Sequence, residues 1–318
     1  MTMITARGSD PEFLAKDKDG KALHFLGVGL QGTKEKPHPV GDGFSIQRDG
    51  AALEFCTPVV STVAEFIAMR NETRERALAT TKELLGKDVV LWEGDHAVFD
   101  KGTFDEWPDS LIVGCDEDEN AYNNAAMPVP GPNWLKRRRI VGGHFHFGHE
   151  DMLPSEAIAK LCDLAISAGR VASREVQPGM RSDYQGKFGV FRRKEYGTEY
   201  RTPGSSIMFT PDAQLEGFLN NLDLLLDWVK VSPDESLSWY LDTQWYNLQH
   251  VATYGSYEAD LYSKDILKGT PDTLRDAWYA APVNEQKNDN HEDYYNEIEQ
   301  IEVEAEAEVI GGEPEGEW

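Results

Sequence analysis

Residues 142–148 read GGHFHFG, a stretch in which histidine and phenylalanine alternate. A period of two is typical of a β-strand, so we expect His144 and His146 on one face and Phe145 and Phe147 on the other. The histidines then form either a polar stripe over a core strand or a pair of metal ligands. The flanking glycines allow a ligand or another backbone to approach closely. The stretch by itself does not choose between these interpretations.

The composition indicates a globular chain. Its 318 residues, 40% hydrophobic and 10% aromatic, are enough for a large domain with a packed core. The formal net charge of -25 argues against nucleic acid binding, because the protein's own field repels phosphates. A small anionic ligand is still able to bind through a divalent cation.

The cysteines and the apolar runs indicate the compartment. Cys56, Cys115 and Cys162 are too few and too widely spaced for a disulfide framework or a CxxC metal site. No signal peptide is recognisable, and no stretch approaches the roughly 20 apolar residues of a membrane helix. We therefore expect a cytoplasmic protein without a membrane partner, and the oligomeric state stays open.

Short apolar runs broken by Gly, Pro and Asp predict strands in the first half of the chain. These runs are EFLAK (12–16), ALHFL (22–26), FSIQ (44–47), ALEFC (52–56), VVLW (89–92) and SLIVG (110–114). Residues 188–209 predict a further strand region, because they are rich in aromatic and β-favouring types.

Helical spacing predicts a helix from Thr62 to Leu85, with a Thr62 and Glu65 capping box and Gly86 as its stop. The other predicted helices are 155–168, 212–230, 238–251 and 271–280. Strands with helices packed on them indicate the α+β class. We expect one folded domain over 1–283 and an acidic tail over 284–318, either disordered or docked on a basic partner.

The formal GxGxxG of residues 27–32, GVGLQG, is not a dinucleotide loop. That motif has meaning only before a helix, and the prolines Pro37 and Pro39 that follow it preclude one. The stretch is interpreted as a glycine-rich turn.

Acidic side chains follow the same i, i+2 spacing as the histidines. Asp10 and Glu12 share one face of an extended chain, unless Asp-Pro starts a turn. Glu54 lies between Leu53 and Phe55 and so points away from the core, as an ordinary exposed strand glutamate also does.

Glu199 and Arg201 also share a face; they either neutralise each other or hold a cation beside an anion. Together these strands predict one polar wall on a concave sheet face. A face rich in carboxylates, with two imidazoles, is a natural site for Mg²⁺ or Mn²⁺, which usually serve phosphate chemistry. Arg192, Arg193 and Lys194 lie near in sequence and either offset phosphate charge or are solvated.

Six motifs occur in one order: GSDPEFLAKD, GTKEKPHP, LEFCTP, GCDEDENAY, GGHFHFG and YGTEYRTP. Over residues 8–204, two thirds of the chain, they resemble the phage-encoded carboxylate-amine ligase (amidoligase) type 2 family. This family has the glutamine synthetase-like and glutamate-cysteine ligase-like fold. The resemblance implies an antiparallel sheet with a concave catalytic face and helices packed on its other side.

The resemblance also implies roles. One metal would be held by Glu12 and Glu54, and a second, bridging ATP phosphates, by Asp10, His144 and Glu199. His146 would lie near the nucleotide, Arg192 and Lys194 would assist at the phosphates, and Arg201 and Glu54 would be catalytic. Two runs depart from the family pattern, TPGSSIMF after EYR and GCDEDE in place of Gly-Cys-Asp-Pro-Asp, so the substrate pocket is expected to differ.

The implied reaction is ATP- and Mg²⁺-dependent amide formation through an acyl phosphate, with small-molecule or peptide carboxylate and amine substrates, in the infected host cell. Two alternatives remain open. One is a zinc hydrolase built on His144 and His146, although the other histidines show no matching ligand spacing. The other is a catalytically silent phage binding or structural protein on the same fold.

Overall fold

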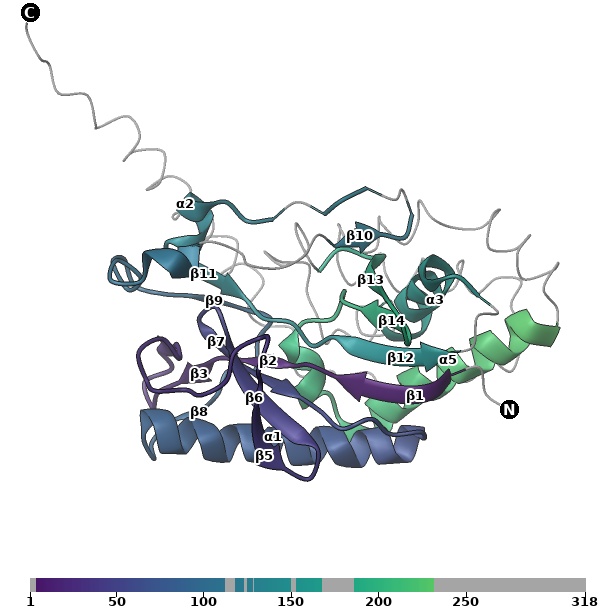
Figure 1. Cartoon of the computed structure of the whole chain (residues 1–318), viewed down its shortest axis with the longest axis horizontal. Coiled ribbons are helices and arrows are strands. Elements are labelled where there is room, and N and C mark those ends of the chain that lie inside the picture. The colour runs from purple at the N-terminus through teal and green to yellow at the C-terminus, as the bar shows by residue number, and fades with distance from the viewer. Residues whose placement is uncertain are drawn as a thin grey trace, which may run out of the picture. The chain divides into compact units, whose positions relative to one another are not determined.

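The computed structural model describes residues 4–111, 118–122, 125–127, 129–149, 153–167 and 186–231 (Figure 1). The predicted helices over 238–251 and 271–280 and the acidic tail over 284–318 lie outside these ranges. Within them, no helix is both long and apolar enough to span a lipid bilayer.

One antiparallel sheet contains the GGHFHFG stretch. Its five strands lie in the order β1-β12-β14-β13-β10. Their bounds are β1 (Ile4–Ser9), β12 (Phe145–His149), β14 (Gly197–Tyr200), β13 (Val190–Lys194) and β10 (Glu119–Asn120). β1 was not predicted, because ITARGS has neither an apolar run nor an alternating pattern.

A second antiparallel sheet contains Glu54, with four strands in the order β2-β7-β6-β5. Their bounds are β2 (Glu12–Phe13), β7 (Ala52–Cys56), β6 (Phe44–Asp49) and β5 (His38–Gly41).

The two sheets meet where β1 and β2, the edge strands, follow each other in the chain. Only Asp10 and Pro11 separate them, and backbone hydrogen bonds continue on both sides of this break. Thr57 N donates to Ser9 O at 3.0 Å and Phe55 N donates to Pro11 O at 3.0 Å. Pro11 has no N–H to donate, so the ladder is interrupted there.

Smaller elements flank these sheets. Three short strands form a sheet in the order β4-β3-β8, and β11 pairs with β9. Their bounds are β3 (Ala15–Lys16), β4 (Ala22–Leu23), β8 (Val90–Leu91), β9 (His96–Val98) and β11 (Arg138–Ile140). The short helices are η1 (Pro108–Leu111), α2 (Pro132–Leu135) and η4 (Ser205–Phe209).

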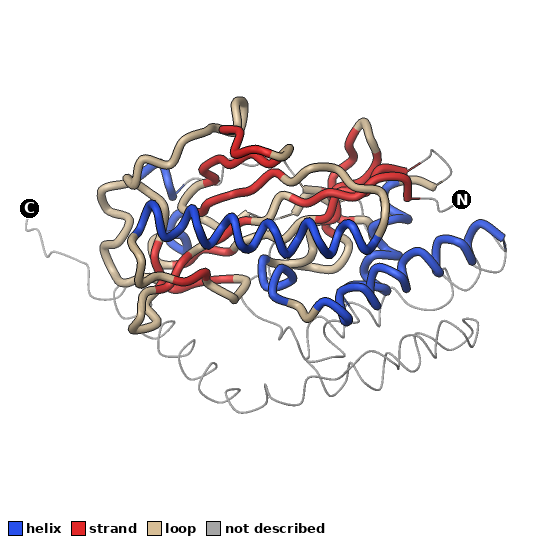
Figure 2. The backbone as a smooth tube through the Cα atoms, turned by 90° about the horizontal axis from the view of Figure 1, so that it is seen from below, coloured by secondary structure: helices blue, strands red, loops and turns tan. Residues whose placement is uncertain are grey.

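Three longer helical segments cover the apolar side of the strands (Figure 2). They are α1 (Val63–Leu85), α3 (Ser155–Cys162), which continues into the π-helical turn η2 (Asp163–Ser167), and α5 (Asp212–Val231). The Phe66 ring of α1 stacks on Phe145, with ring centroids 5.3 Å apart. The phenylalanines of GGHFHFG therefore face the helices, as the alternation predicts.

Most of the predicted elements are confirmed. α1 begins after Thr62 with the predicted capping box and ends at Gly86, and the overall class is α+β. The glycine-rich turn at 27–32 is confirmed, since Gly27, Gly29 and Gly32 all have positive φ.

Two strand predictions are wrong. Residues 108–111 form a 3-10 turn, in which Ser110 N donates to Trp107 O. Residues 205–209 form another, because Asp95 Oδ1 accepts from Ser206 N at 2.8 Å and supports that turn.

A buried polar group ties β14 to the helical layer. Asp163 of η2 is fully buried and accepts hydrogen bonds from Tyr200 Oη at 2.6 Å and Tyr122 Oη at 2.8 Å. Burial raises the pKa of the Asp163 carboxyl to about 7, although these hydrogen bonds act in the opposite direction. Tyr200 stands between Glu199 and Arg201, so this anchor fixes the strand that carries them.

The Asp163 pKa makes stability depend on pH. Between its ordinary pKa of 3.8 and about 7 the folded state binds more protons than the unfolded state, so the free energy of unfolding falls as pH rises through that window. In Asp163→Asn this contribution, on the order of 4 kcal/mol, is absent and the pH profile is flatter. Urea unfolding at pH 5 to 8 measures it, with the exposed Asp88→Asn as control. If the free energy of unfolding changed equally with pH in the wild-type protein, Asp163→Asn and Asp88→Asn, the assignment would be refuted.

Candidate functional site

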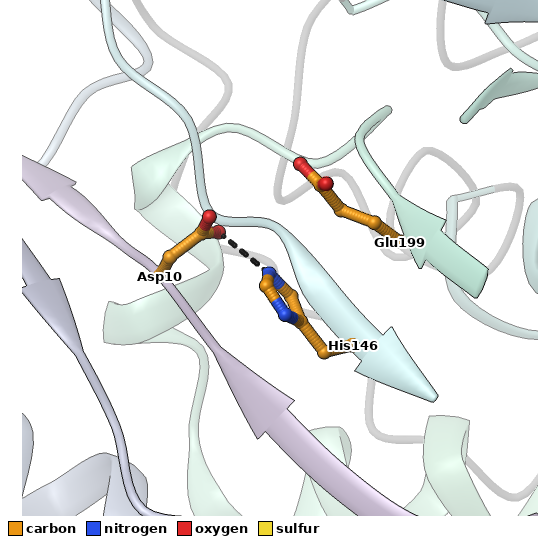
Figure 3. Close-up of side chains that lie close together, drawn as sticks. All are labelled: Asp10, His146 and Glu199. Atoms are coloured by element: carbon orange, nitrogen blue, oxygen red, sulfur yellow. Dashed lines mark ion pairs between the residues drawn. The ribbon is translucent and has the colours of Figure 1, made fainter. Parts of the chain in front are cut away.

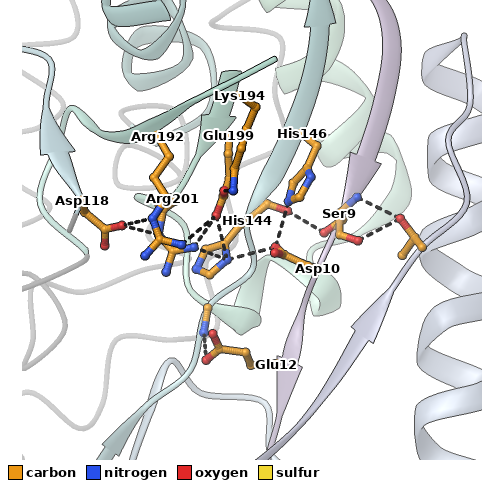
Figure 4. A network of polar contacts seen from close by, with 12 residues as sticks. Ser9, Asp10, Glu12, Asp118, His144, His146, Arg192, Lys194, Glu199 and Arg201 are labelled. Carbon is orange, nitrogen blue, oxygen red and sulfur yellow. Dashed lines mark hydrogen bonds and ion pairs between the residues drawn. The ribbon is translucent and has the colours of Figure 1, made fainter. Parts of the chain in front are cut away.

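Strand register aligns two polar rows on the face turned away from the helices. Figure 4 shows the first row, His146, Glu199 and Arg192, together with Glu12 of the second. Cross-strand partners project to the same side of a sheet. His146 pairs with Glu199, and Glu199 pairs with Arg192, across β12, β14 and β13. Glu12 pairs with Glu54, and Glu54 with Gln47, across β2, β7 and β6.

Asp10 lies between the two rows. Its Oδ1 is 3.0 Å from His144 Nδ1 and 3.1 Å from His146 Nε2, so both imidazoles contact one carboxylate oxygen. Burial alone raises the Asp10 pKa, but the two histidines hold it well below its usual value. The predicted placement of Asp10 and Glu12 on one strand is wrong, because the chain passes between sheets at Pro11. The shared face of the two histidines is confirmed.

Glu199 is surrounded by positive charge. It pairs with the Arg201 guanidinium, its Oε2 lies 2.7 Å from Lys194 Nζ, and its Oε1 lies 3.8 Å from Arg192 Nη1. Burial acts to raise its pKa, but the charge of Arg201, with smaller effects of the two histidines, lowers it to about 2. The expected mutual neutralisation of Glu199 and Arg201 is therefore seen, and Glu199 is ionised at neutral pH.

Glu12 and Glu54 form the opposite kind of environment. Both are buried, and burial together with the negative charges of Asp10 and Glu12 raises the Glu54 pKa to about 9. Glu12 Oε2 accepts a hydrogen bond from Gly142 N at 2.8 Å, while Glu12 N donates to Gly142 O at 2.8 Å. Two buried carboxyls side by side favour a proton or a cation between them.

Three of these groups have the spacing of a metal site. Ligand atoms of Asp10, His146 and Glu199 all lie within 4.8 Å of one another (Figure 3). Two carboxylates and one imidazole suit Mg²⁺ or Mn²⁺ better than Zn²⁺. Glu199 is buried, and Asp10 and His146 are partly buried. The residues therefore fit a divalent cation.

His144 lies beside this group. Its Nδ1 is 3.1 Å from Arg201 Nη1 as well as close to Asp10, and within the described ranges its buried Nε2 has no hydrogen-bond partner. Its assignment as a metal ligand stays a prediction. His146 also contacts Tyr196, whose Oη is 2.7 Å from His146 Nδ1.

Two site residues were not selected from the sequence. Asp118 Oδ1 lies 2.7 Å from Arg192 Nε and 3.0 Å from Arg201 Nε. Asp118 belongs to the GCDEDENAY motif, so the sequence did indicate this segment. Because its neighbours are also acidic, the motif does not identify which carboxylate lies in the site. Gln47 is buried beside Glu54, and only the strand register identifies it.

The first two glycines of GGHFHFG, Gly142 and Gly143, exclude a side chain for different reasons. A Cβ at Gly142 would overlap the His144 imidazole, and a Cβ at Gly143 would overlap the Gly204 carbonyl. The close approach expected from the sequence is therefore confirmed for a backbone, at Gly143.

Gly142→Ala is expected to displace the His144 ring and lower the free energy of unfolding by about 1–3 kcal/mol through overpacking. The control is Gly217→Ala in α5, where a Cβ meets nothing within 4 Å; it is expected to stabilise the helix by about 0.5–1 kcal/mol. Chemical denaturation and the His144 NMR signals measure both effects. Wild-type stability with an unmoved His144 in Gly142→Ala would disprove the contact.

Known proteins show limited similarity to this chain. No curated protein matches the chain. A crystal structure of a bifunctional glutathione synthetase from Pasteurella multocida is similar with 10% identity and a TM-score of 0.43, over 87% of this chain and 48% of that one. The chain thus spans about half the length of that synthetase. At this level the likeness carries no argument about fold or activity.

A family described as Phage phiEco32-like COOH.NH2 ligase-type 2 matches residues 112–219, about a third of the chain. The matched segment holds His144, His146, Glu199 and Arg201, while Asp10, Glu12 and Glu54 precede it. The resemblance identified from the sequence motifs is confirmed: over residues 112–219 the chain is similar to the phage phiEco32-like COOH.NH2 ligases of type 2.

Proposed function

We propose that the protein is an ATP-dependent carboxylate-amine ligase that uses Mg²⁺ or Mn²⁺. The observation that carries the proposal is the arrangement of Asp10, His146 and Glu199 at metal-ligand spacing beside Arg201 and Lys194. The family match, which names a COOH.NH2 ligase, supports it.

The acidic residues would hold the cations. Asp10, His146 and Glu199, with His144 as a further candidate, would bind one, and Glu12 with Glu54 a second. When bound, such cations polarise phosphate oxygens and reduce their negative charge. The buried Glu12 and Glu54 pair supports the second position, because burial and, after it, the negative charges of Asp10 and Glu12 raise the Glu54 pKa.

The basic residues would hold the phosphates. Arg201, Arg192 and Lys194 all lie within 4 Å of Glu199, so they surround the metal-binding carboxylate. Guanidinium groups match phosphate oxygens in a bidentate manner. We therefore place the transferred phosphoryl group beside Arg201, with His146 near the nucleotide.

The reaction would proceed in two steps. A substrate carboxylate oxygen attacks the γ-phosphorus of ATP; the new O–P bond forms as the bond to ADP breaks, giving an acyl phosphate. An amine then attacks the carbonyl carbon, the C–N bond forms, phosphate leaves, and the amine loses its proton. The first step brings several negative charges together, and Arg201 and Glu54 with its cation would offset them.

The finer structural assignments belong to the same proposal. The two adjacent antiparallel sheets, with helices on one side and the polar residues on the other, support a glutamine synthetase-like fold. A catalytic domain over 1–283 with a separate acidic tail stays part of the proposal. A zinc hydrolase is less well supported, because the described group at metal-ligand spacing has two carboxylates and only one imidazole.

Glu54→Gln is expected to remove a cation ligand at nearly constant shape. ADP release with ATP and Mg²⁺, over mixed pools of carboxylates and amines, should fall about 100-fold, and Mn²⁺ affinity should fall about tenfold or more. The control is Glu75→Gln on the exposed side of α1, which removes one carboxylate far from the site in sequence and leaves both values unchanged. Unchanged ADP release in Glu54→Gln would reject the metal role, and wild-type protein that releases no ADP over any pool would favour the catalytically silent alternative.

A further inference from the structure

Asp118 is the only described carboxylate within ion-pair distance of both Arg192 and Arg201 apart from Glu199, and it stands just before β10. Its side chain is 5% exposed, and those of Arg192 and Arg201 are 11% and 6% exposed. Because the contact is nearly dry, each charge in it needs a nearby countercharge.

The contacts use different parts of each arginine. Asp118 Oδ1 lies against the Nε atoms of both guanidinium groups, at 2.7 and 3.0 Å. The terminal Nη1 atoms of the same groups lie on the side of Glu199. Figure 4 shows the two arginines between Asp118 and Glu199. Asp118 thus contacts the Nε atom of each guanidinium group. The terminal Nη1 atoms remain on the side of Glu199, the carboxylate that we propose binds the metal.

Two like charges held this close repel each other. Asp118 and Glu199 are the described carboxylates that contact both arginines, and Glu199 also contacts Lys194. One cation bound at Glu199 would leave even less negative charge for the arginines. Asp118 would still offset the charge of both arginines when a cation occupies Glu199.

We infer that Asp118 is the positioning residue of the site: it holds Arg192 and Arg201 as a pair that receives the terminal phosphoryl group of the nucleotide. The inference rests on the proposed function for the identity of the anion. Asp118 itself touches neither metal nor nucleotide in this account. It acts through the two arginines, so removing it changes recognition of the γ-phosphate more than recognition of the rest of the nucleotide.

The neighbouring residue provides a matched control. Glu119, next in the chain, pairs with Arg193, whose side chain is 49% exposed and which also contacts Glu156. Glu119→Gln therefore removes one carboxylate and one arginine contact from the same short strand, outside the polar rows. A merely structural effect at β10 would appear in both variants, and a positioning effect only in Asp118→Asn.

The first measurement is the mobility of the arginine side chains by ¹⁵N relaxation of the Nε–H groups, assigned with Arg192→Lys and Arg201→Lys. We expect both groups to be rigid in the wild-type protein and in Glu119→Gln, and mobile in Asp118→Asn. Asp118→Glu, which keeps the charge, should recover part of the rigidity. Two arginines equally rigid in Asp118→Asn would overturn the inference. If Asp118→Asn does not fold, Asp118→Glu decides: it should show intermediate mobility, and wild-type rigidity with wild-type nucleotide preference would count against the inference.

The second measurement is the affinity of the full chain for the Mg²⁺ complexes of AMP-PNP and ADP by calorimetry. Asp118→Asn should reduce the preference for AMP-PNP over ADP by about tenfold or more, with ADP affinity little changed, because misplaced arginines lose the γ-phosphate contact. Glu119→Gln should keep the wild-type preference. An unchanged preference in Asp118→Asn contradicts the inference. Wild-type protein that binds neither nucleotide contradicts the proposed function instead, and the relaxation data still decide whether Asp118 orders the arginines.

Discussion

The break in the strand ladder at Asp10 and Pro11 is the constraint on which the rest of the site depends. Pro11 has no amide hydrogen, so β1 and β2 cannot form one regular strand, and each becomes the edge of its own sheet. Hydrogen bonds from Thr57 and Phe55 on one side, and to Gly142 on the other, keep the two sheets adjacent. Asp10 is thereby placed where both rows of polar side chains begin, and its carboxylate meets both histidines.

Charge is distributed unevenly over these two rows. The row of His146, Glu199 and Arg192 is balanced, since the positive groups around Glu199 hold its pKa near 2. In the row of Glu12 and Glu54, burial and the negative charges of Asp10 and Glu12 raise the Glu54 pKa to about 9. Unbalanced negative charge is therefore concentrated at the second row, where a cation is favoured. The divalent cation that accompanies a nucleotide supplies such a charge.

The sequence predicts the strands and their faces well where local patterns are strong. His144 with His146 and Glu54 between Leu53 and Phe55 follow simple alternation, and the capping box at Thr62 places α1 correctly. The resemblance to a ligase family also comes from sequence motifs, and the family match confirms it.

Other features depend on register, which no local pattern encodes. Spacing predicts Asp10 and Glu12 on one strand, but sheet pairing separates them. Pairing across β7 and β6 brings Gln47 to Glu54, and the fold brings Asp118 to Arg192 and Arg201, 74 and 83 residues away in sequence as counted from their numbers. Such long-range contacts become visible only when the sheets are assembled.

The most direct test of the central claim, that these rows form one nucleotide and metal site, is a crystal structure with Mn²⁺ and AMP-PNP. Anomalous scattering locates the manganese independently of any assumption about the ligands. We expect a peak within coordination distance of Asp10 and Glu199 and the γ-phosphate beside Arg201. Manganese or nucleotide bound elsewhere, with Asp10 still paired only to the two histidines, would contradict the account.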